Sequence, residues 1–158
     1  MKNKLNHDIP PWVADDAIFF ITVCCRQRHI NSLAKPEVAD QIRESLFYRQ
    51  SLRQWWTVYA LVMPDHFHAL FAFGRGLEMK KVVTDWKRFL SYHSKIEWQE
   101  DFFDHRIRSD ESLDEKMEYI RHNSVRQGLI TRPEDWHSAW MGNELIGSQP
   151  TAGRLHRQ

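Results

Sequence analysis

The residues best suited to chemistry are two histidines separated by one residue, His66 and His68. They begin the segment His66–Phe73, with the sequence HFHALFAF. This segment is rich in aromatic residues and is predicted to form a β-strand. Residues i and i+2 of a strand point to the same face, so both imidazoles should project from one side of a sheet. Two adjacent imidazoles can clamp a divalent metal ion. A pair of partly buried polar histidines without a metal is the alternative.

A tyrosine and an asparagine form a second candidate pair on a predicted helix. Ser112 and Glu115 have capping-box spacing, and the helix is predicted to end at Gly128. At 100° per residue, Tyr119 and Asn123 lie one turn apart on one flank of this helix, where they are neighbours. From there they can reach across onto a sheet; alternatively, Tyr119 is a surface tyrosine with its hydroxyl in water. The inner stripe of the helix comprises Leu113, Met117, Ile120 and Ser124.

The elements that must position these residues alternate regularly along the chain. Strands are predicted over residues 17–27, 55–63, 66–73 and 102–108, and helices after Pro36, Met79 and Ser112. This order predicts an α+β fold, a ferredoxin-like antiparallel sheet with helices on one face and an added C-terminal helix that carries Tyr119. The expected domain spans residues 17–140, between an arm over 1–16 and a mobile basic tail over 141–158. Phe67, Ala69, Phe71 and Phe73 should face the first two helices.

Composition narrows the functional classes. The 158 residues are 42% hydrophobic and 13% aromatic, which indicates a folded domain rather than a disordered chain. A formal net charge of +1 argues against a polycation that coats DNA, although a local basic groove is compatible with it. The sequence predicts neither a signal peptide nor a membrane-spanning segment. The adjacent Cys24 and Cys25 should point to opposite strand faces and not pair, so a reducing cytoplasm is expected.

Motifs for several common enzyme classes are absent from the sequence. A Walker loop, GxGxxG, GxSxG and HExxH are all missing. These absences disfavour nucleotide hydrolysis, dinucleotide redox chemistry and the common hydrolases.

Three segments resemble, in their order, the single-tyrosine HUH transposases. They are MPDHFHALF at 63–71, WKRFLSYH at 86–93 and the run from Trp98 to Trp136, which is the most specific of the three. Among these enzymes the chain is most similar to the REP-associated tyrosine transposases, which are linked to repeated extragenic palindromes in bacterial chromosomes. The resemblance covers roughly residues 17–140.

The resemblance implies a role for each candidate residue. His66 and His68 match the HUH metal ligands, Tyr119 matches the catalytic tyrosine, and Asn123 matches the ligand that completes the metal site. The implied cofactor is a divalent ion, Mg²⁺ or Mn²⁺. One departure is Ser124, where the family usually has proline. Without that proline we expect a straighter or longer helix end and a displaced Asn123.

The implied activity is metal-dependent cleavage and transfer of single-stranded DNA beside palindromic hairpins, through a 5′-phosphotyrosine intermediate. The implied partner is therefore single-stranded or hairpin DNA, and no membrane is involved. The expected location is the bacterial cytoplasm, at the nucleoid. A monomer is favoured over a dimer. Basic residues near the candidate site or on the second predicted helix are candidate phosphate contacts. They are Lys87, Arg88, Arg106, Arg108, Arg121 and Arg126.

Two other functions fit the same residues. One is a non-catalytic hairpin DNA- or RNA-binding module in which the histidines are idle. The other is a metal-dependent nuclease in which water attacks and Tyr119 is incidental. The transposase chemistry also needs a base, because a phenol is mostly protonated at neutral pH. Glu115, one turn before Tyr119, is a candidate base, but helix capping explains this carboxylate equally well.

Overall fold

The computed structural model describes residues 9–108 and 111–146, which form an antiparallel five-stranded sheet in the order β4-β1-β3-β2-β5. The first four strands of this order have the ferredoxin-like arrangement, which confirms the predicted fold class. β5 is added at the β2 edge. The strands are β1 (Val13–Cys24), β2 (Trp55–Val62), β3 (His66–Gly74), β4 (Phe103–Arg106) and β5 (Ala139–Trp140).

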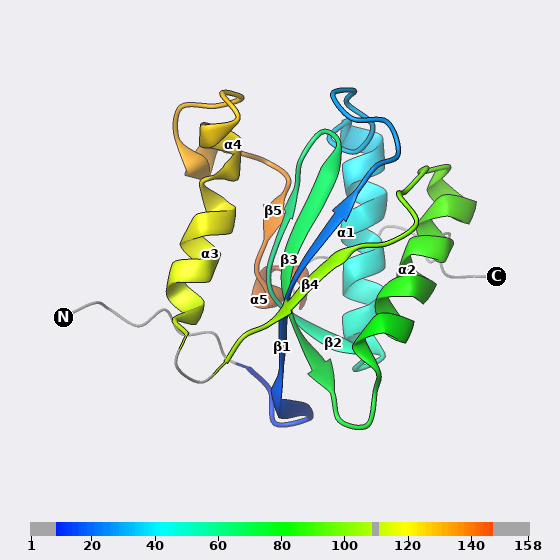
Figure 1. Ribbon diagram of the computed structural model, residues 1–158, viewed down its shortest axis with the longest axis vertical. Helices are drawn as coiled ribbons and strands as arrows, with labels where there is room; N and C mark the ends of the chain where they lie inside the picture. The colour runs from blue at the N-terminus through cyan, green and yellow to red at the C-terminus, as the bar shows by residue number, and fades with distance from the viewer. Residues whose placement is uncertain (1–8, 109–110, 147–158) are drawn as a thin grey trace.

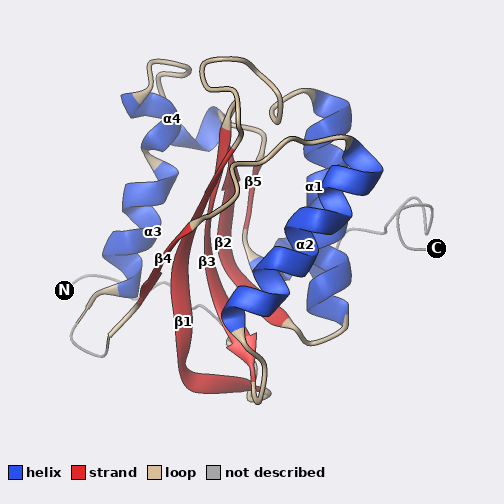
Figure 2. Cartoon of the chain, turned by 45° about the vertical axis from the view of Figure 1, so that its right-hand side comes forward, coloured by secondary structure: helices blue, strands red, loops and turns tan. Residues whose placement is uncertain are grey.

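Helices cover the two faces of the sheet unequally. Figure 1 shows α1 (Pro36–Ser51) and α2 (Met79–Ser94) on one side of the sheet. On the other side lie α3 (Leu113–Arg121) and α4 (Asn123–Arg126), and Figure 2 shows the sheet between the two layers. The predicted added helix therefore packs on the face opposite the first two helices. Within the described residues, no helix is long and apolar enough to cross a membrane.

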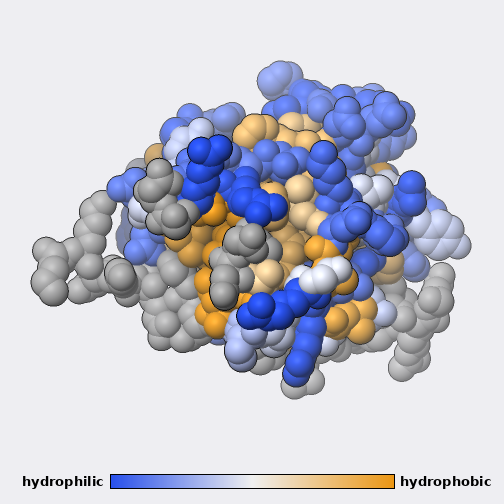
Figure 3. Space-filling view, turned by 60° about the horizontal axis from the view of Figure 1, so that its bottom comes forward, coloured by the Kyte–Doolittle hydropathy of each residue, from blue (hydrophilic) through white to orange (hydrophobic). Residues whose placement is uncertain are grey.

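The core has two parts because successive strand residues point to opposite faces. Phe67, Ala69, Phe71 and Phe73 are buried in the cluster beneath α1 and α2, as their spacing predicts. In this cluster the Trp55 ring stacks on Phe71 with a centroid separation of 3.9 Å. On the surface at the end where β1 begins, Figure 3 shows an apolar patch bordered by hydrophilic side chains.

The second part of the core holds α3 against the sheet. Met117 and Ile120 are buried in a cluster with Phe20, Leu70 and Ala72. Of the remaining stripe residues, Ser124 is buried and Leu113 is half-buried. The predicted inner stripe is thus confirmed, and it determines which side of α3 faces the histidines of β3.

Ser112 begins α3 as the sequence predicts, and its hydroxyl accepts a hydrogen bond from the Glu115 backbone N–H at 3.2 Å. We expect Ser112→Ala to lower the free energy of unfolding by about 1 kcal/mol, because a donor in the first turn loses its acceptor. Urea denaturation followed by circular dichroism measures this change. Ser112→Asp should retain wild-type stability, since aspartate also caps helices. Equal stability of Ser112→Ala and Ser112→Asp would contradict the capping role.

Several boundaries differ from the predicted ones. β1 begins at Val13 rather than Ala17, because Val13 pairs with Gly74 across the sheet, so pairing starts inside the expected arm. Helix α5 (Gly142–Ile146) occupies the first part of the expected tail, with Leu145 buried in the core. The 3₁₀ turn η1 (Pro133–Asp135), like β5 and α5, is too short to show a hydrophobic period in the sequence. Residues 1–8, 109–110 and 147–158 lie outside the described residues.

Candidate functional site

The two histidines lie side by side at the start of β3. Their ring centroids are 4.7 Å apart, with the planes at 80°. His66 is buried and His68 is half-buried on the face that α3 and α4 cover. The prediction that they share one face of a strand is confirmed.

Neighbouring polar groups orient both rings. His66 Nδ1 lies 2.7 Å from Asp65 Oδ1, and because a carboxylate only accepts, this ring carries its proton on Nδ1. The other Asp65 oxygen accepts from Arg28 Nε at 2.9 Å and from the His29 backbone N–H at 2.8 Å. Thr22 Oγ1 lies 2.8 Å from His68 Nδ1. These contacts leave Nε2 of each ring as the nitrogen available to a ligand.

Both imidazoles are suited to metal binding because they resist protonation. Burial lowers the pKa of His68 to about 3, and the adjacent His66 and the Arg126 and Arg28 guanidiniums act in the same direction. Burial also lowers the pKa of His66, although Asp65 partly opposes the effect. A metal ion requires neutral imidazole, so the rings are in the required form at neutral pH.

Asn123 reaches the histidines from the opposite layer. Its buried side chain places Nδ2 3.3 Å from His66 Nε2, where the amide donates to the unprotonated ring nitrogen. Rotating the amide by 180° brings its oxygen to the same position. The expected straightening of the helix at Ser124 is wrong. The helix stops at Arg121 and restarts at Asn123, with His122 between them in a turn conformation at φ −83° and ψ 0°.

The residues at this site fit a divalent metal ion. Two imidazole nitrogens and one amide oxygen are ligands that Mn²⁺ and related ions accept, while Mg²⁺ favours sites with more oxygen. In residues 9–108 and 111–146, no group of three or more His, Cys, Asp or Glu side chains is placed to hold a metal. The remaining ligands would therefore be water or substrate oxygens, which is typical of catalytic rather than structural sites.

Asp65 should influence metal affinity without touching the metal. We expect Asp65→Asn to weaken Mn²⁺ binding by about 10- to 100-fold, because the amide orients and polarises the His66 ring less well than the carboxylate. Isothermal titration calorimetry with Mn²⁺ measures the effect. Asp40→Asn, an exposed change on α1, is the matched control and should leave the affinity unchanged. Wild-type affinity in Asp65→Asn would show that this carboxylate has no such role.

Tyr119 lies on α3, one turn before Asn123, with 58% of its surface exposed. The Arg126 guanidinium carbon is 4.2 Å from its ring centroid, and Arg126 Nη2 donates to the Tyr119 backbone oxygen at 2.6 Å. The tyrosine also lines a hollow of about 550 Å³ together with Phe20. Because the Phe20 ring is 5.6 Å from His68, this hollow adjoins the histidines. Tyr119 is thus at the surface, while Asn123 is buried.

The six basic residues proposed as phosphate contacts divide between the two layers. Arg126 and Arg121 belong to the layer of Tyr119, and Arg121 is ion-paired with Glu118 at 3.6 Å and Glu134 at 3.3 Å. Arg88 is exposed on α2, and the Arg106 guanidinium lies over the Phe19 ring at 5.1 Å, toward the core under α1 and α2. Arg108 is exposed after β4. The fold therefore brings only some of the six near the candidate site.

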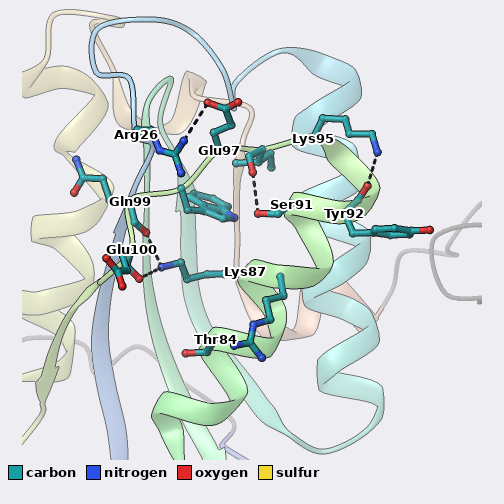
Figure 4. Close-up of a pocket in the computed structure, with 12 residues that line it drawn as sticks. Arg26, Thr84, Lys87, Ser91, Tyr92, Lys95, Glu97, Gln99 and Glu100 are labelled. Carbon is teal, nitrogen blue, oxygen red and sulfur yellow. Dashed lines mark hydrogen bonds and ion pairs between the residues drawn. The ribbon is translucent and has the colours of Figure 1, made fainter.

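Lys87 differs most from expectation, because a candidate phosphate contact should be exposed and this side chain is buried. Its Nζ donates to the backbone oxygens of Gln99 at 2.9 Å and Glu100 at 3.0 Å, as Figure 4 shows. Burial lowers the pKa of this ammonium. The segment after Trp98 crosses this side of α2, which helical periodicity alone does not reveal. The Lys87 ammonium thus holds that segment against α2 through these hydrogen bonds.

Three supporting residues were not predicted. Asp65 belongs to the turn between β2 and β3, where turn propensity already explained it. Thr22 pairs with His68 across β1 and β3, a register that only the assembled sheet defines. Phe20 has the pattern of an ordinary core residue. The position of Asp65 directly before the histidine pair is the one signal in the sequence that points to its role.

Comparisons with known proteins show what the chain is similar to. A protein described as "Putative REP-associated tyrosine transposase" from Haemophilus influenzae is 25% identical over 139 residues, which cover 75% of this chain and 76% of that protein. The solved structure of a REP-associated tyrosine transposase bound to a REP hairpin superposes with a TM-score of 0.71. The resemblance is confirmed.

The structural match extends over most of both molecules. It covers 93% of this chain and 87% of the REP-associated tyrosine transposase, at 19% sequence identity. At that identity it shows a shared α+β fold. No family model matches the chain.

Proposed function

We propose that this chain is a metal-dependent enzyme of the transposase kind, which cleaves and joins single-stranded DNA beside palindromic hairpins through a 5′-phosphotyrosine intermediate. The observation that carries the proposal is the 3.3 Å approach of Asn123 Nδ2 to His66 Nε2, with Tyr119 one helical turn away. This approach brings two of the candidate ligands together, and the candidate nucleophile Tyr119 lines the hollow that adjoins the histidines. The hairpin-bound relative of the same fold supports hairpin DNA as the substrate class.

The proposed reaction exchanges a phosphodiester bond of the DNA for a phosphotyrosine bond to the protein. The Tyr119 Oη gives its proton to a base and attacks the scissile phosphorus, and the bond from phosphorus to the 3′ oxygen breaks. The leaving oxygen takes a proton and becomes a 3′-hydroxyl, while the tyrosine remains linked to the 5′ phosphate. A second 3′-hydroxyl can reverse the step and join strands without ATP. A divalent ion held by His66, His68 and Asn123 would polarise the phosphate and offset its developing negative charge.

Arg126 has a position suited to assisting Tyr119. Its guanidinium, 4.2 Å from the ring centroid, favours negative charge developing on the phenol. The same group can donate to a phosphate oxygen, since its planar fork matches phosphate geometry. Arg126 is thus the basic residue from the sequence prediction that best fits a contact beside the scissile phosphate.

The test is a search for a covalent protein–DNA adduct. Single-stranded oligonucleotides with palindromic hairpins, labelled at the 3′ end, are incubated with the protein and Mg²⁺, Mn²⁺ or EDTA, then run on denaturing gels. We expect a labelled band at protein mass that EDTA removes. Cleavage without an adduct would favour the water-using nuclease. Binding without cleavage on every hairpin, including those from the source genome, would favour the non-catalytic module.

A further inference from the structure

We propose that the hollow beside Tyr119 binds one unpaired nucleobase of the DNA strand that the tyrosine attacks, with the base stacked on Phe103. This inference rests on the proposed function for the identity of the strand, and it adds the pocket that holds it. The hollow of about 550 Å³ lies within the range of about 300–1,000 Å³ that small-ligand sites occupy. It is lined by Phe20, Phe103, His105, Glu115, Lys116 and Tyr119.

The aromatic wall of this hollow is exposed to solvent. Phe103 on β4 has 59% of its surface accessible, which is unusual for a phenylalanine in a sheet. Its ring meets Phe20 edge-to-face, with centroids 6.0 Å apart, so the Phe103 ring is braced from one side. An exposed, braced aromatic ring is the platform on which single-stranded DNA-binding proteins stack bases.

The aromatic wall continues to the histidines. Phe20 contacts Phe103 on one side and lies 5.6 Å from His68 on the other. Tyr119 contributes to the same hollow from α3. A base stacked on Phe103 therefore holds its own sugar–phosphate next to the phenol and the metal-binding residues.

The rim of the hollow has polar groups that suit a nucleotide. His105 Nε2 lies 3.0 Å from both carboxylate oxygens of Glu111, and Lys116 Nζ is 3.6 Å from Glu111 Oε2. Lys116, paired with Glu111, thus places a cation beside the aromatic wall, and the carboxylate of Glu115 and the ring of His105 also line the hollow. An aromatic surface with an adjacent cation matches a base and its phosphate better than it matches an apolar peptide.

A second exposed aromatic residue, Tyr92, borders the groove drawn in Figure 4. Lys95 Nζ already lies 5.4 Å from the centroid of its ring and donates to the Tyr92 backbone oxygen at 3.0 Å. This groove also belongs to α2, on the sheet face away from Tyr119. Tyr92 therefore provides a matched aromatic control rather than a competing base site.

The experiment compares two fluorescein-labelled probes by fluorescence anisotropy, dT8 and an eight-residue abasic strand with the same phosphates. It uses the Tyr119→Phe background, so that covalent capture contributes nothing. We expect about 10-fold tighter binding of dT8 than of the abasic strand, within the effect of stacking one base. Phe103→Ala should remove this preference by weakening dT8 alone. Phe103→Leu, which keeps apolar volume but lacks a flat ring, should do the same, whereas Tyr92→Ala should retain the preference.

Three results would overturn the pocket. They are equal binding of the two probes, an undiminished preference in both Phe103 variants, and loss of the preference in Tyr92→Ala instead. Failure of the proposed function leaves a different signature. In that case the base preference persists and depends on Phe103, while the wild-type chain forms no adduct with any hairpin.

Discussion

Tyr119→Phe should abolish the covalent protein–DNA adduct while leaving DNA binding nearly intact. The substitution removes only the hydroxyl, and the ring that Arg126 contacts at 4.2 Å remains. Because the side chain is 58% exposed, no buried hydrogen bond or core contact is lost with it. We expect adduct yield to fall by on the order of 10³-fold or more, since no other group replaces a missing nucleophile.

Denaturing gels measure the adduct, and anisotropy with a labelled hairpin measures binding. Tyr92→Phe is the matched control, because this tyrosine is also exposed but lies on α2. It should form the adduct at the wild-type rate. An unchanged adduct yield in Tyr119→Phe would exclude this tyrosine as the nucleophile. Cleavage that persists without any adduct would favour attack by water.

Replacing both histidines, His66→Ala with His68→Ala, should remove metal-dependent cleavage. Their Nε2 atoms are two of the three protein ligands that we propose, so the remaining amide cannot hold the ion alone. The expected fall in cleavage rate is about 10³-fold, which corresponds to several kcal/mol of lost charge stabilisation. The fold should persist, because the Asp65 carboxylate keeps its hydrogen bonds from Arg28 and His29.

Calorimetry with Mn²⁺ and thermal melting distinguish loss of the metal from loss of the fold. His93→Ala with His137→Ala removes two imidazoles from other parts of the chain and should leave both cleavage and Mn²⁺ binding unchanged. Substantial cleavage by the His66/His68 variant with added Mn²⁺ would place the ion elsewhere. Unfolding of this variant would show that the histidines are structural rather than ligands.

Local pattern was enough to predict the strands β1 to β4, the helices α1 to α3 and the faces of the candidate site. The alternation in His66–Phe73 places the histidines on one face of β3 and Phe67 on the other, because the strand repeat is two residues. The cap at Ser112 and the stripe through Met117 and Ile120 follow from the first-turn donors and the 3.6-residue helical period. Each of these features depends on residues that are near one another along the chain.

Tertiary structure decided which of these faces meet. Asn123 and His66 are 57 positions apart in the sequence, and only the packing of α3 and α4 on the sheet brings them within 3.3 Å. The break at His122 and the burial of Lys87 also depend on segments that local periodicity does not place. Phe103 and Tyr119 share a hollow because β4 pairs with β1 beside α3. Periodicity indicates a direction for each side chain, whereas the pairing of strands and the packing of layers determine its partner.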